Sequence, residues 1–319
     1  MKRFIVKFSK FFGFFFILIL LIAFCLEMII KENIKGKQFM FHADWTSKVN
    51  ENYQILFLGN SRVWAHINAE LISNKTNSKA YNLTQNSKSI KFLWYKFQNY
   101  LKYNAPPKDL FLQFDNKFIS DLYKKPWPEK ENFLTYIYKN PLNLNELFQK
   151  EVGFTEFDTH IPIIRYYGYP SVFYSHITGK TNCDLQHTKK SYQYGYEGQK
   201  ANWNEFKSVD EPNSPWNYPL KKDYNTLHLN YADSFRIYCQ LNNVKLHLFY
   251  PPISYSSYEI ISQKDKDELL NYIMKHQIDY HDFNSIIFND STLFYNHTHL
   301  NNLGSSIFTN LLIERYFEK

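Results

Sequence analysis

Two short segments far apart in the chain carry the residue types that nucleophilic catalysis requires. Ser61 follows an apolar run and a glycine in the segment ILFLGNSR, and His299 lies in the segment FYNHTHLNNLGSSIF. A nucleophilic serine needs a rigid backbone, nearby amide N–H groups that receive an oxyanion, and a base within hydrogen-bond reach. Ser61 alone could equally be the N-cap of the helix that follows it. The presence of His299 favours the catalytic interpretation.

The pair of histidines His297 and His299 also raises a metal-binding alternative. A His-x-His pair can chelate zinc, and His281 and Asp282 are conceivable further ligands. However, the helical pattern that directly follows His299 favours a hydrolase, and the sequence has no Cys-x-x-Cys. We therefore expect neither a metal ion nor another cofactor.

The elements that must position these residues follow from an alternation of short apolar runs with amphipathic stretches. Strands that alternate with helices predict an α/β fold with a doubly wound, mostly parallel sheet, in which ligands bind beyond the carboxyl ends of the strands. Ser61 comes directly after such an end. The predicted strands are residues 54–58, 79–83, 109–114, 244–250 and 278–283, and the predicted helices lie around 67–72, 90–103, 227–242, 261–276 and 303–317.

The N-terminal segment predicts a membrane anchor. An apolar run begins at Phe11 and ends at Ile30, and its 20 residues suffice to cross the hydrocarbon core as a helix. Basic residues precede the run, which places the N-terminus in the cytoplasm and the remainder of the chain outside it, in the periplasm or on the cell surface. A cleaved signal peptide is the alternative, but no small-x-small cleavage site follows the run.

The domain organisation follows from these patterns. Residues 1–30 form the cytoplasmic N-terminus and transmembrane anchor, residues 31–50 a polar stalk, and residues 51–319 one domain. Between about residues 120 and 225 the periodicity dissolves and prolines are frequent, which predicts an insertion with short helices that could form a lid or a glycan-binding wall. The net charge of +7 is spread along the chain, so we expect no nucleic-acid partner.

The two segments around Ser61 and His299 resemble those of the SGNH, or GDSL-like, hydrolases, closest to members anchored in a membrane. That family carries its serine in a Gly-x-Ser block after the first strand, matched here by residues 59–61 (GNS). It carries its base in the pattern D-x-x-H-L-N-x-x-G before the last helix, matched by residues 296–304 (NHTHLNNLG). The resemblance implies that Ser61 is the nucleophile and His299 its base.

One position departs from the family pattern, because Asn296 stands where the family has an aspartate. An amide can accept a hydrogen bond from the histidine ring, but it cannot stabilise the charge of an imidazolium. The site would then be a Ser–His dyad, or a backbone carbonyl or another acid would assist it; Asp282 and Asp290 are nearby in sequence. Weakened or lost activity is the third alternative.

The resemblance also implies an oxyanion hole. Its donors would be the backbone N–H groups of Ser61 and Ser87 and the side-chain amide of Asn116, whereas Asp115 would repel the oxyanion. Arg62, next to the nucleophile, either braces the turn through a carboxylate or binds an anionic substrate group.

The family resemblance implies an activity. We expect a serine-dependent ester hydrolase or O-acyltransferase that acts on acyl esters, acetyl esters above all, of envelope or exported polysaccharide. Its partners would be the lipid bilayer, an acylated glycan or other ester substrate, and a membrane-bound acyl donor. The alternative is an SGNH-like glycan-binding protein without activity that assists an export or acylation complex.

Overall fold

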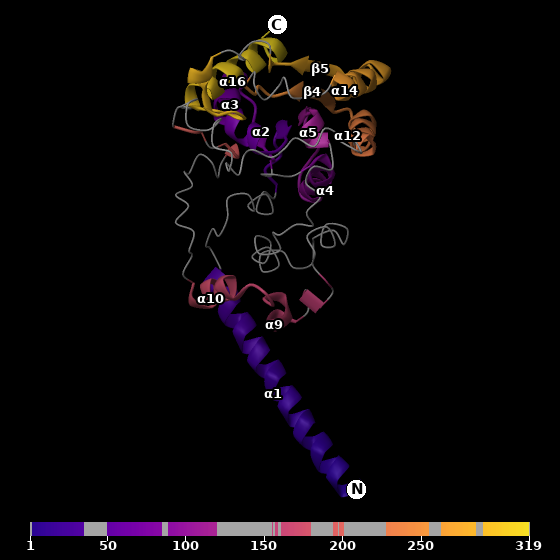
Figure 1. Cartoon of the computed structure of the whole chain (residues 1–319), viewed down its shortest axis with the longest axis vertical. Coiled ribbons are helices and arrows are strands. Elements are labelled where there is room, and N and C mark those ends of the chain that lie inside the picture. Colours follow the sequence, from indigo (N-terminus) through magenta and orange to yellow (C-terminus); the bar gives the residue numbers. More distant parts are fainter. Residues whose placement is uncertain are drawn as a thin grey trace. The chain divides into compact units, whose positions relative to one another are not determined.

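A computed structural model of the chain divides into two compact units, Met1–Ser47 with Lys125–Gln186 and Lys48–Lys124 with His187–Lys319 (Figure 1). We describe each unit by itself. The structure describes residues 2–34, 50–84, 89–119, 155, 157–158, 161–179, 194–196, 198–200, 228–254, 263–284 and 290–318. Most of the predicted stalk and insertion lies outside these residues.

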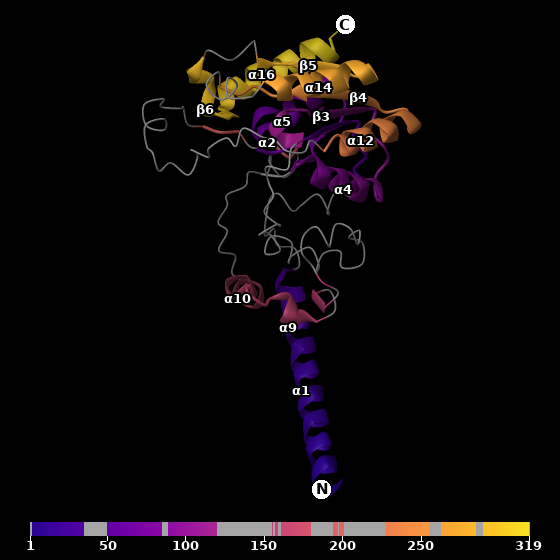
Figure 2. The ribbon, with the colours of Figure 1, turned by 45° about the vertical axis from the view of Figure 1, so that its right-hand side comes forward.

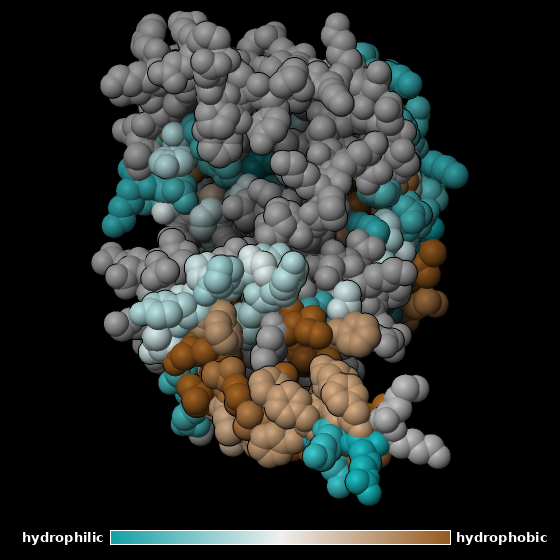
Figure 3. Space-filling model, turned by 60° about the horizontal axis from the view of Figure 1, so that its bottom comes forward, coloured by the Kyte–Doolittle hydropathy of each residue, from teal (hydrophilic) through white to brown (hydrophobic). Residues whose placement is uncertain are grey.

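The first unit is built around one long apolar helix, α1 (Lys2–Ile34). Its 33 residues give it a length of about 50 Å, and its span Arg3–Asn33 is long and apolar enough to cross a membrane. The helix therefore extends beyond the predicted run at both ends. Figure 3 shows its apolar side chains in brown and tan at the surface, where few neighbours cover them.

Two short helices of the insertion pack on one end of α1, as Figures 1 and 2 show. They are α9 (Pro162–Arg165) and α10 (Pro170–Thr178). Both begin with proline at the first helical position, where the missing N–H group leaves no hydrogen bond unmade. The sequence prediction of short helices within the insertion is met by these two elements.

The second unit contains a five-stranded sheet in the order β2-β1-β3-β4-β5, with every pair of neighbours parallel. This confirms the predicted parallel α/β sheet. Short, fully apolar strands such as ILFL in β1 form because both faces of the sheet are covered. The strands are β1 (Ile55–Leu58), β2 (Ala80–Asn82), β3 (Asp109–Gln113), β4 (Lys245–Tyr250) and β5 (Asp279–Asp282).

Helices cover both faces of this sheet. One face carries α2 (Ser61–His66), α3 (Ala69–Thr76) and α16 (Asn302–Tyr316), and the other carries α4 (Ile90–Leu101), α12 (Leu229–Leu241) and α14 (Gln263–His276). Figure 1 shows α16 with α3 on one side and α4 with α12 on the other. The helix predicted around residues 67–72 corresponds to α3, which begins after Asn68 because the Asn68 side chain caps it by accepting a hydrogen bond from Leu71 N at 3.1 Å. The short helix α2 before it was not predicted.

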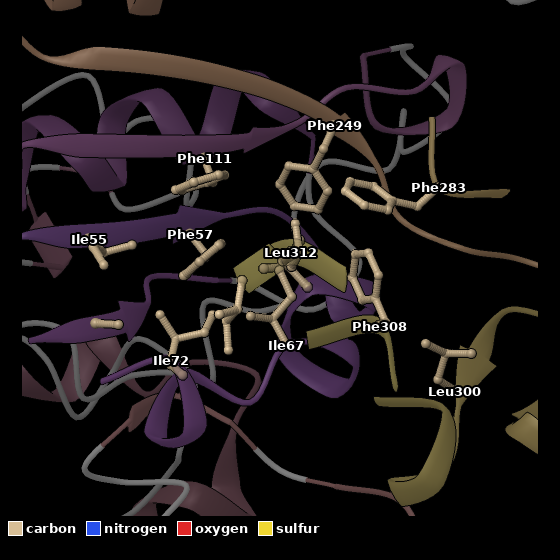
Figure 4. Packing of buried hydrophobic residues seen from close by; sticks show 14 of the residues in the cluster. Ile55, Phe57, Ile67, Ile72, Phe111, Phe249, Phe283, Leu300, Phe308 and Leu312 are labelled. Atoms are coloured by element: carbon tan, nitrogen blue, oxygen red, sulfur yellow. The ribbon is translucent and has the colours of Figure 1, made fainter. Parts of the chain in front are cut away.

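The apolar core lies between the sheet and the face of α2, α3 and α16 (Figure 4). Phe57 of β1 and Phe111 of β3 stack at 4.7 Å between ring centroids. Phe308 and Leu312 of α16 are fully buried against this layer. Close packing here gives the carboxyl end of β1 a rigid support.

A small antiparallel hairpin, which the sequence did not predict, precedes α16. It pairs β6 (Phe294–Asn296) with β7 (His299–Leu300). The hairpin matters because it contains both Asn296 and His299.

The insertion begins and ends at neighbouring points of the second unit. It departs after α5 (Asn116–Ile119), and the chain returns at His228, whose N–H donates to the Ile119 carbonyl at 2.9 Å. The two ends of the insertion are thus in direct contact.

Candidate active site

The turn after β1 is shaped by Gly59. A Cβ atom at this position would lie 2.1 Å from Val63 Cγ2 and 2.5 Å from Gln113 Oε1, so only glycine fits. Asn60 then caps α2, because its side-chain oxygen accepts a hydrogen bond from Arg62 N at 3.0 Å. The interpretation of Ser61 as the N-cap is therefore wrong: Ser61 is the first helical residue, and its hydroxyl is left for another partner.

That partner is His299. The Ser61 Oγ and His299 Nε2 atoms are 2.8 Å apart, although 238 residues separate them. Both side chains are partly buried, so the hydroxyl can still be reached. The structure thus brings together the two residues that the sequence analysis paired.

Asn296 determines the protonation pattern of His299. The Asn296 Oδ1 atom accepts hydrogen bonds from the backbone N–H groups of Thr298 at 3.0 Å and His299 at 2.9 Å, which identifies it as the amide oxygen. The same atom lies 3.0 Å from His299 Nδ1. Since an amide oxygen can only accept, Nδ1 carries the proton, and Nε2 is left to accept the hydroxyl proton of Ser61.

The remaining residues of the C-terminal segment hold this hairpin against α16. Leu300 is buried in the core, and Asn301 caps α16 by accepting a hydrogen bond from Gly304 N at 3.0 Å. A Cβ atom on Gly304 would lie 2.2 Å from the Leu293 carbonyl oxygen, so the helix can approach the preceding segment only with glycine. The pattern H-L-N-x-x-G therefore has a structural reason at each fixed position.

On its other side, Ser61 is flanked by a buried ion pair. Arg62 Nη2 lies 2.7 Å from Asp115 Oδ1, and the two side chains are 6% and 0% exposed. The guanidinium also lies 5.7 Å from the centroid of the Tyr250 ring. Arg62 therefore braces the turn, as one of the two sequence interpretations proposed. Asp115 is neutralised by this pair, so the expectation that it repels an oxyanion does not apply.

Gln113 connects the ion pair to the backbone before the nucleophile. Its Nε2 donates to Asp115 Oδ2 at 2.6 Å, and its Oε1 accepts from Asn60 N at 3.0 Å. Asp115 Oδ1 also accepts from Phe118 N at 3.1 Å, which ties the pair to α5. Sequence reasoning missed this role of Gln113.

The proposed oxyanion donors lie around the same turn. The backbone N–H of Ser61, in the first turn of α2, has no hydrogen-bond acceptor within the described part of the chain. The Asn116 side chain is 1% exposed, and neither its nitrogen nor its oxygen is hydrogen-bonded to any described residue. Ser87 lies outside the described residues.

Lys96, in α4, anchors the end of the strand that precedes Ser87. Its side chain is buried and Nζ donates a hydrogen bond to the Thr84 carbonyl oxygen. Burial lowers the pKa of Lys96 well below its ordinary value, which favours the neutral amine. The sequence offered no signal for this contact beyond the apolar helix around the lysine.

His66 is a second residue that sequence reasoning missed. It is fully buried at the end of α2, its Nε2 accepts a hydrogen bond from Leu300 N at 3.0 Å, and its ring centroid lies 6.1 Å from that of His299. Burial, followed by repulsion from His299 and Arg62, lowers the pKa of His66 well below its ordinary value, against an opposing hydrogen bond with the Thr298 backbone. His66 therefore connects the helix that begins at Ser61 to the segment that contains His299 as a neutral ring.

The other acids and histidines considered from the sequence have structural partners. Asp282 accepts from Asn284 N at 2.8 Å, and Asp290 accepts from Thr292 N at 3.0 Å. The His281 ring packs edge-on against Phe283, with centroids 4.4 Å apart. Across the described ranges, no three His, Cys, Asp or Glu side chains gather in a way that could hold a metal ion.

Comparison with known proteins adds no family assignment to this geometry. No protein-family model matches the chain, and no curated protein matches its sequence.

Proposed function

We propose that this protein is an SGNH-like serine esterase or O-acyltransferase that proceeds through an acyl-enzyme on Ser61. The observation that carries the proposal is the 2.8 Å contact between Ser61 Oγ and His299 Nε2. The protonated Nδ1 on the far side of the ring supports it, because Nε2 is then the atom that can take the hydroxyl proton.

The reaction begins when Ser61 Oγ attacks the carbonyl carbon of an ester while its proton moves to His299 Nε2. The tetrahedral intermediate collapses as the carbon–oxygen bond to the alcohol breaks, and His299 returns the proton to the leaving oxygen. Water or a sugar hydroxyl then attacks the acyl-enzyme, with His299 as its base, and frees Ser61. Water as acceptor makes the protein an esterase, and a sugar hydroxyl makes it a transferase.

The oxyanion would be held by the Ser61 N–H and the Asn116 side-chain amide. The lack of a hydrogen-bond acceptor for either donor among the described residues supports these roles, since buried amides are otherwise paired. The Ser87 N–H is the third proposed donor. The buried Arg62–Asp115 pair stabilises the turn that carries Ser61 and contributes no acid or base to the reaction.

Asn296 lowers the rate without preventing the reaction. In a Ser–His–Asp protease, an amide in place of the acid costs about 10⁴-fold because it leaves the histidine in the wrong tautomer. Here two backbone N–H groups orient the amide oxygen of Asn296 toward Nδ1, so the productive tautomer is kept. Only the charge stabilisation of the imidazolium is missing.

The place of action follows from α1 as a proposed membrane anchor. Its N-terminal part carries Arg3, Lys7 and Lys10, and basic residues of this kind remain on the cytoplasmic side. The Ser61 unit would then act outside the cytoplasm, where acyl esters of envelope or exported polysaccharide are its substrates. A membrane-bound acyl donor would supply the acyl group to a transferase.

A fluorophosphonate probe tests the proposal on the full-length protein in membranes. We expect the probe to label wild type and to fail on Ser61→Ala and His299→Ala. Ser306→Ala is a matched control, because Ser306 is also a partly exposed serine and its hydroxyl donates to Asn302 O of its own helix at 2.9 Å. Absence of both labelling and ester hydrolysis in folded wild type would contradict the enzyme assignment.

The amide at residue 296 favours one alternative, an accessory protein of the same fold that binds acylated glycan without turnover. It predicts glycan binding that is unchanged in Ser61→Ala and no probe labelling of wild type. The two functions are therefore separated by the same set of variants.

A further inference from the structure

One stripe of α1 is covered by the insertion, whereas the rest of this helix is exposed. Ala23 and Ile30 are buried, and Asn33 donates a side-chain hydrogen bond to the Ile177 carbonyl of α10. These positions recur at the spacing of one helix face. The C-terminal part of α1, from Ala23 within the apolar run to Asn33 beyond it, therefore receives α9 and α10.

An ion pair between Arg165 and Glu27 fixes the position of α9 along the axis of α1. Arg165 Nη1 lies 3.4 Å from Glu27 Oε1 and 3.5 Å from Oε2, and Arg165 Nε donates to the Asp158 carbonyl at 2.7 Å. The side chains are 2% and 15% exposed for Arg165 and Glu27. Glu27 stands three residues before the end of the apolar run, about 4.5 Å along the axis at 1.5 Å per residue.

If α1 spans a bilayer, the Glu27–Arg165 pair lies near the outer edge of the hydrocarbon core. A run of about 20 residues matches the hydrocarbon core, so Glu27 lies just inside the outer edge of that core, where an uncompensated carboxylate is costly. Arg165 neutralises Glu27 at the same depth. Residues that neighbour Arg165 on α9 must then lie near the layer between acyl chains and headgroups.

The neighbours of Arg165 on the other side of the segment are apolar and exposed. Phe157, Ile164 and Tyr167 are 64%, 41% and 86% exposed, and Tyr174 of α10 is 60% exposed. Hydrogen bonds from Ile161 N to Phe157 O and from Arg165 N to Ile161 O continue the helical spacing across this segment. Arg165 thus contacts α1 and Asp158 is buried, while Phe157 and Ile164, also seven residues apart, are exposed.

We propose that Phe157, Ile164, Tyr167 and Tyr174 form a second membrane-contacting surface, which rests in the headgroup layer beside α1. The bilayer is the occupant because this surface lies on the segment that packs against the exposed apolar helix α1, at a depth set by the Glu27–Arg165 contact. Tyrosine is favoured in that layer because its ring is apolar and its hydroxyl is polar. The insertion would thereby be fixed in both tilt and depth at the membrane. This proposal rests on α1 crossing the membrane.

Site-directed fluorescence in phospholipid vesicles tests the surface. Full-length protein whose own cysteines are replaced by alanine receives one environment-sensitive label at Ile164→Cys or Tyr167→Cys. We expect blue-shifted emission and quenching by lipids brominated near the headgroups. Leu20→Cys in α1, 47% exposed, is the control for the anchor and should be quenched by deeply brominated lipids. Leu241→Cys, 78% exposed in the second unit, is the aqueous control.

The controls separate the possible failures. Quenching at residue 20, with labels at 164 and 167 that behave like the label at 241, would overturn the surface while the anchor stands. Labels at 164 and 167 that are shielded in native membranes but not in pure lipid would assign the surface to a protein partner and also overturn the proposal. No quenching at residue 20 would remove the anchor on which it rests. Fluorophosphonate labelling of Ser61 is independent of all three outcomes.

A pair of substitutions tests the role of the ion pair. Arg165→Gln should reduce the quenching at residue 167, because the insertion loses its fixed depth. Lys31→Gln is the matched control, since Lys31 approaches the same carboxylate only to 3.9 Å and is 52% exposed. Equal quenching in Arg165→Gln and Lys31→Gln would overturn the ion pair as the element that sets the depth.

Discussion

The contacts around Ser61 differ in kind between the side of His299 and the side of Asp115. Toward His299 the contacts are neutral, with an amide at Asn296 behind the imidazole, and all of these side chains are partly exposed. Toward Asp115 the contacts are ionic and fully buried. The Asp115 carboxylate thus stabilises the turn that carries Ser61 and does not contact His299. The charged pair has a structural role, whereas the proposed chemistry depends on neutral groups that are oriented by hydrogen bonds.

The largest effect is expected on the ionic side. Asp115→Ala leaves the buried Arg62 guanidinium without its carboxylate, which should lower the free energy of unfolding by about 3–5 kcal/mol. Urea unfolding of the full-length protein in detergent measures this. Asp290→Ala, which removes a carboxylate cap, should cost only about 1 kcal/mol. An equal decrease in the free energy of unfolding in Asp115→Ala and Asp290→Ala would mean that the buried ion pair stabilises the fold no more than a single helix cap does.

The next effect is expected on the neutral side. Asn296→Ala removes the acceptor for His299 Nδ1, so the ring loses both its orientation and its preferred tautomer. We expect the rate of fluorophosphonate labelling to fall by about 10²-fold, with little change in the unfolding midpoint. A variant that labels as fast as wild type would show that Asn296 does not position the base.

Restoring a carboxylate on that side should raise the rate. In Asn296→Asp, one oxygen can keep all the hydrogen bonds of Asn296 Oδ1 and adds a charge beside the imidazolium. A gain of about tenfold in ester hydrolysis corresponds to a shift of roughly one unit in the histidine pKa. Asn301→Asp, at the cap of α16, is the control for a new charge in the same segment. A fall in rate would indicate an enzyme adapted to the amide.

The smallest effect concerns the neutral ring of His66. Because the pKa of His66 is lowered in the folded state, the unfolded chain binds more protons as the pH falls below about 6.5. Stability should therefore be full above that pH and decline below it, by up to about 1.4 kcal/mol per pH unit from this group. In His66→Gln, the free energy of unfolding should decrease less as the pH falls. Burial also lowers the pKa of His176, in the first unit, to about 4, so a comparison with His176→Gln distinguishes the pH dependence due to His176 from that due to His66.

Much of the fold and half of the site were predictable from the sequence. Apolar runs that end at Gly59 or at prolines mark the buried strands, and the pairing of Ser61 with His299 follows from two motifs that strand order brings to one edge of a sheet. Those signals are local in the chain. Periodicity therefore predicts the five strands of the sheet and most of its helices within a residue or two, but it misses α2 and the β6–β7 hairpin.

The rest depends on contacts between side chains that no local pattern encodes. Backbone angles at the turn decide that Asn60 caps α2 and that the Ser61 hydroxyl stays available to His299. The Arg62–Asp115 pair joins segments that follow different strands. His66 carries no signal, because a buried histidine in an apolar helix looks like a core residue. Asn296 can orient the His299 ring because its side-chain oxygen points toward Nδ1, and this direction cannot be inferred from the composition of the segment.

The hydrogen bond between His228 N and Ile119 O has a consequence for how such a chain can change. Ile119 and His228 are held together at the edge of the sheet unit, so the chain between them closes a loop whose two ends are fixed. Lengthening such a loop is inexpensive, at about 0.6 kcal/mol for each doubling. The length of the segment between residues 119 and 228 could therefore change at little cost to the scaffold around Ser61, provided that Tyr196 and Gln199 keep their hydrogen bonds with Ser305 and Asn302 of α16.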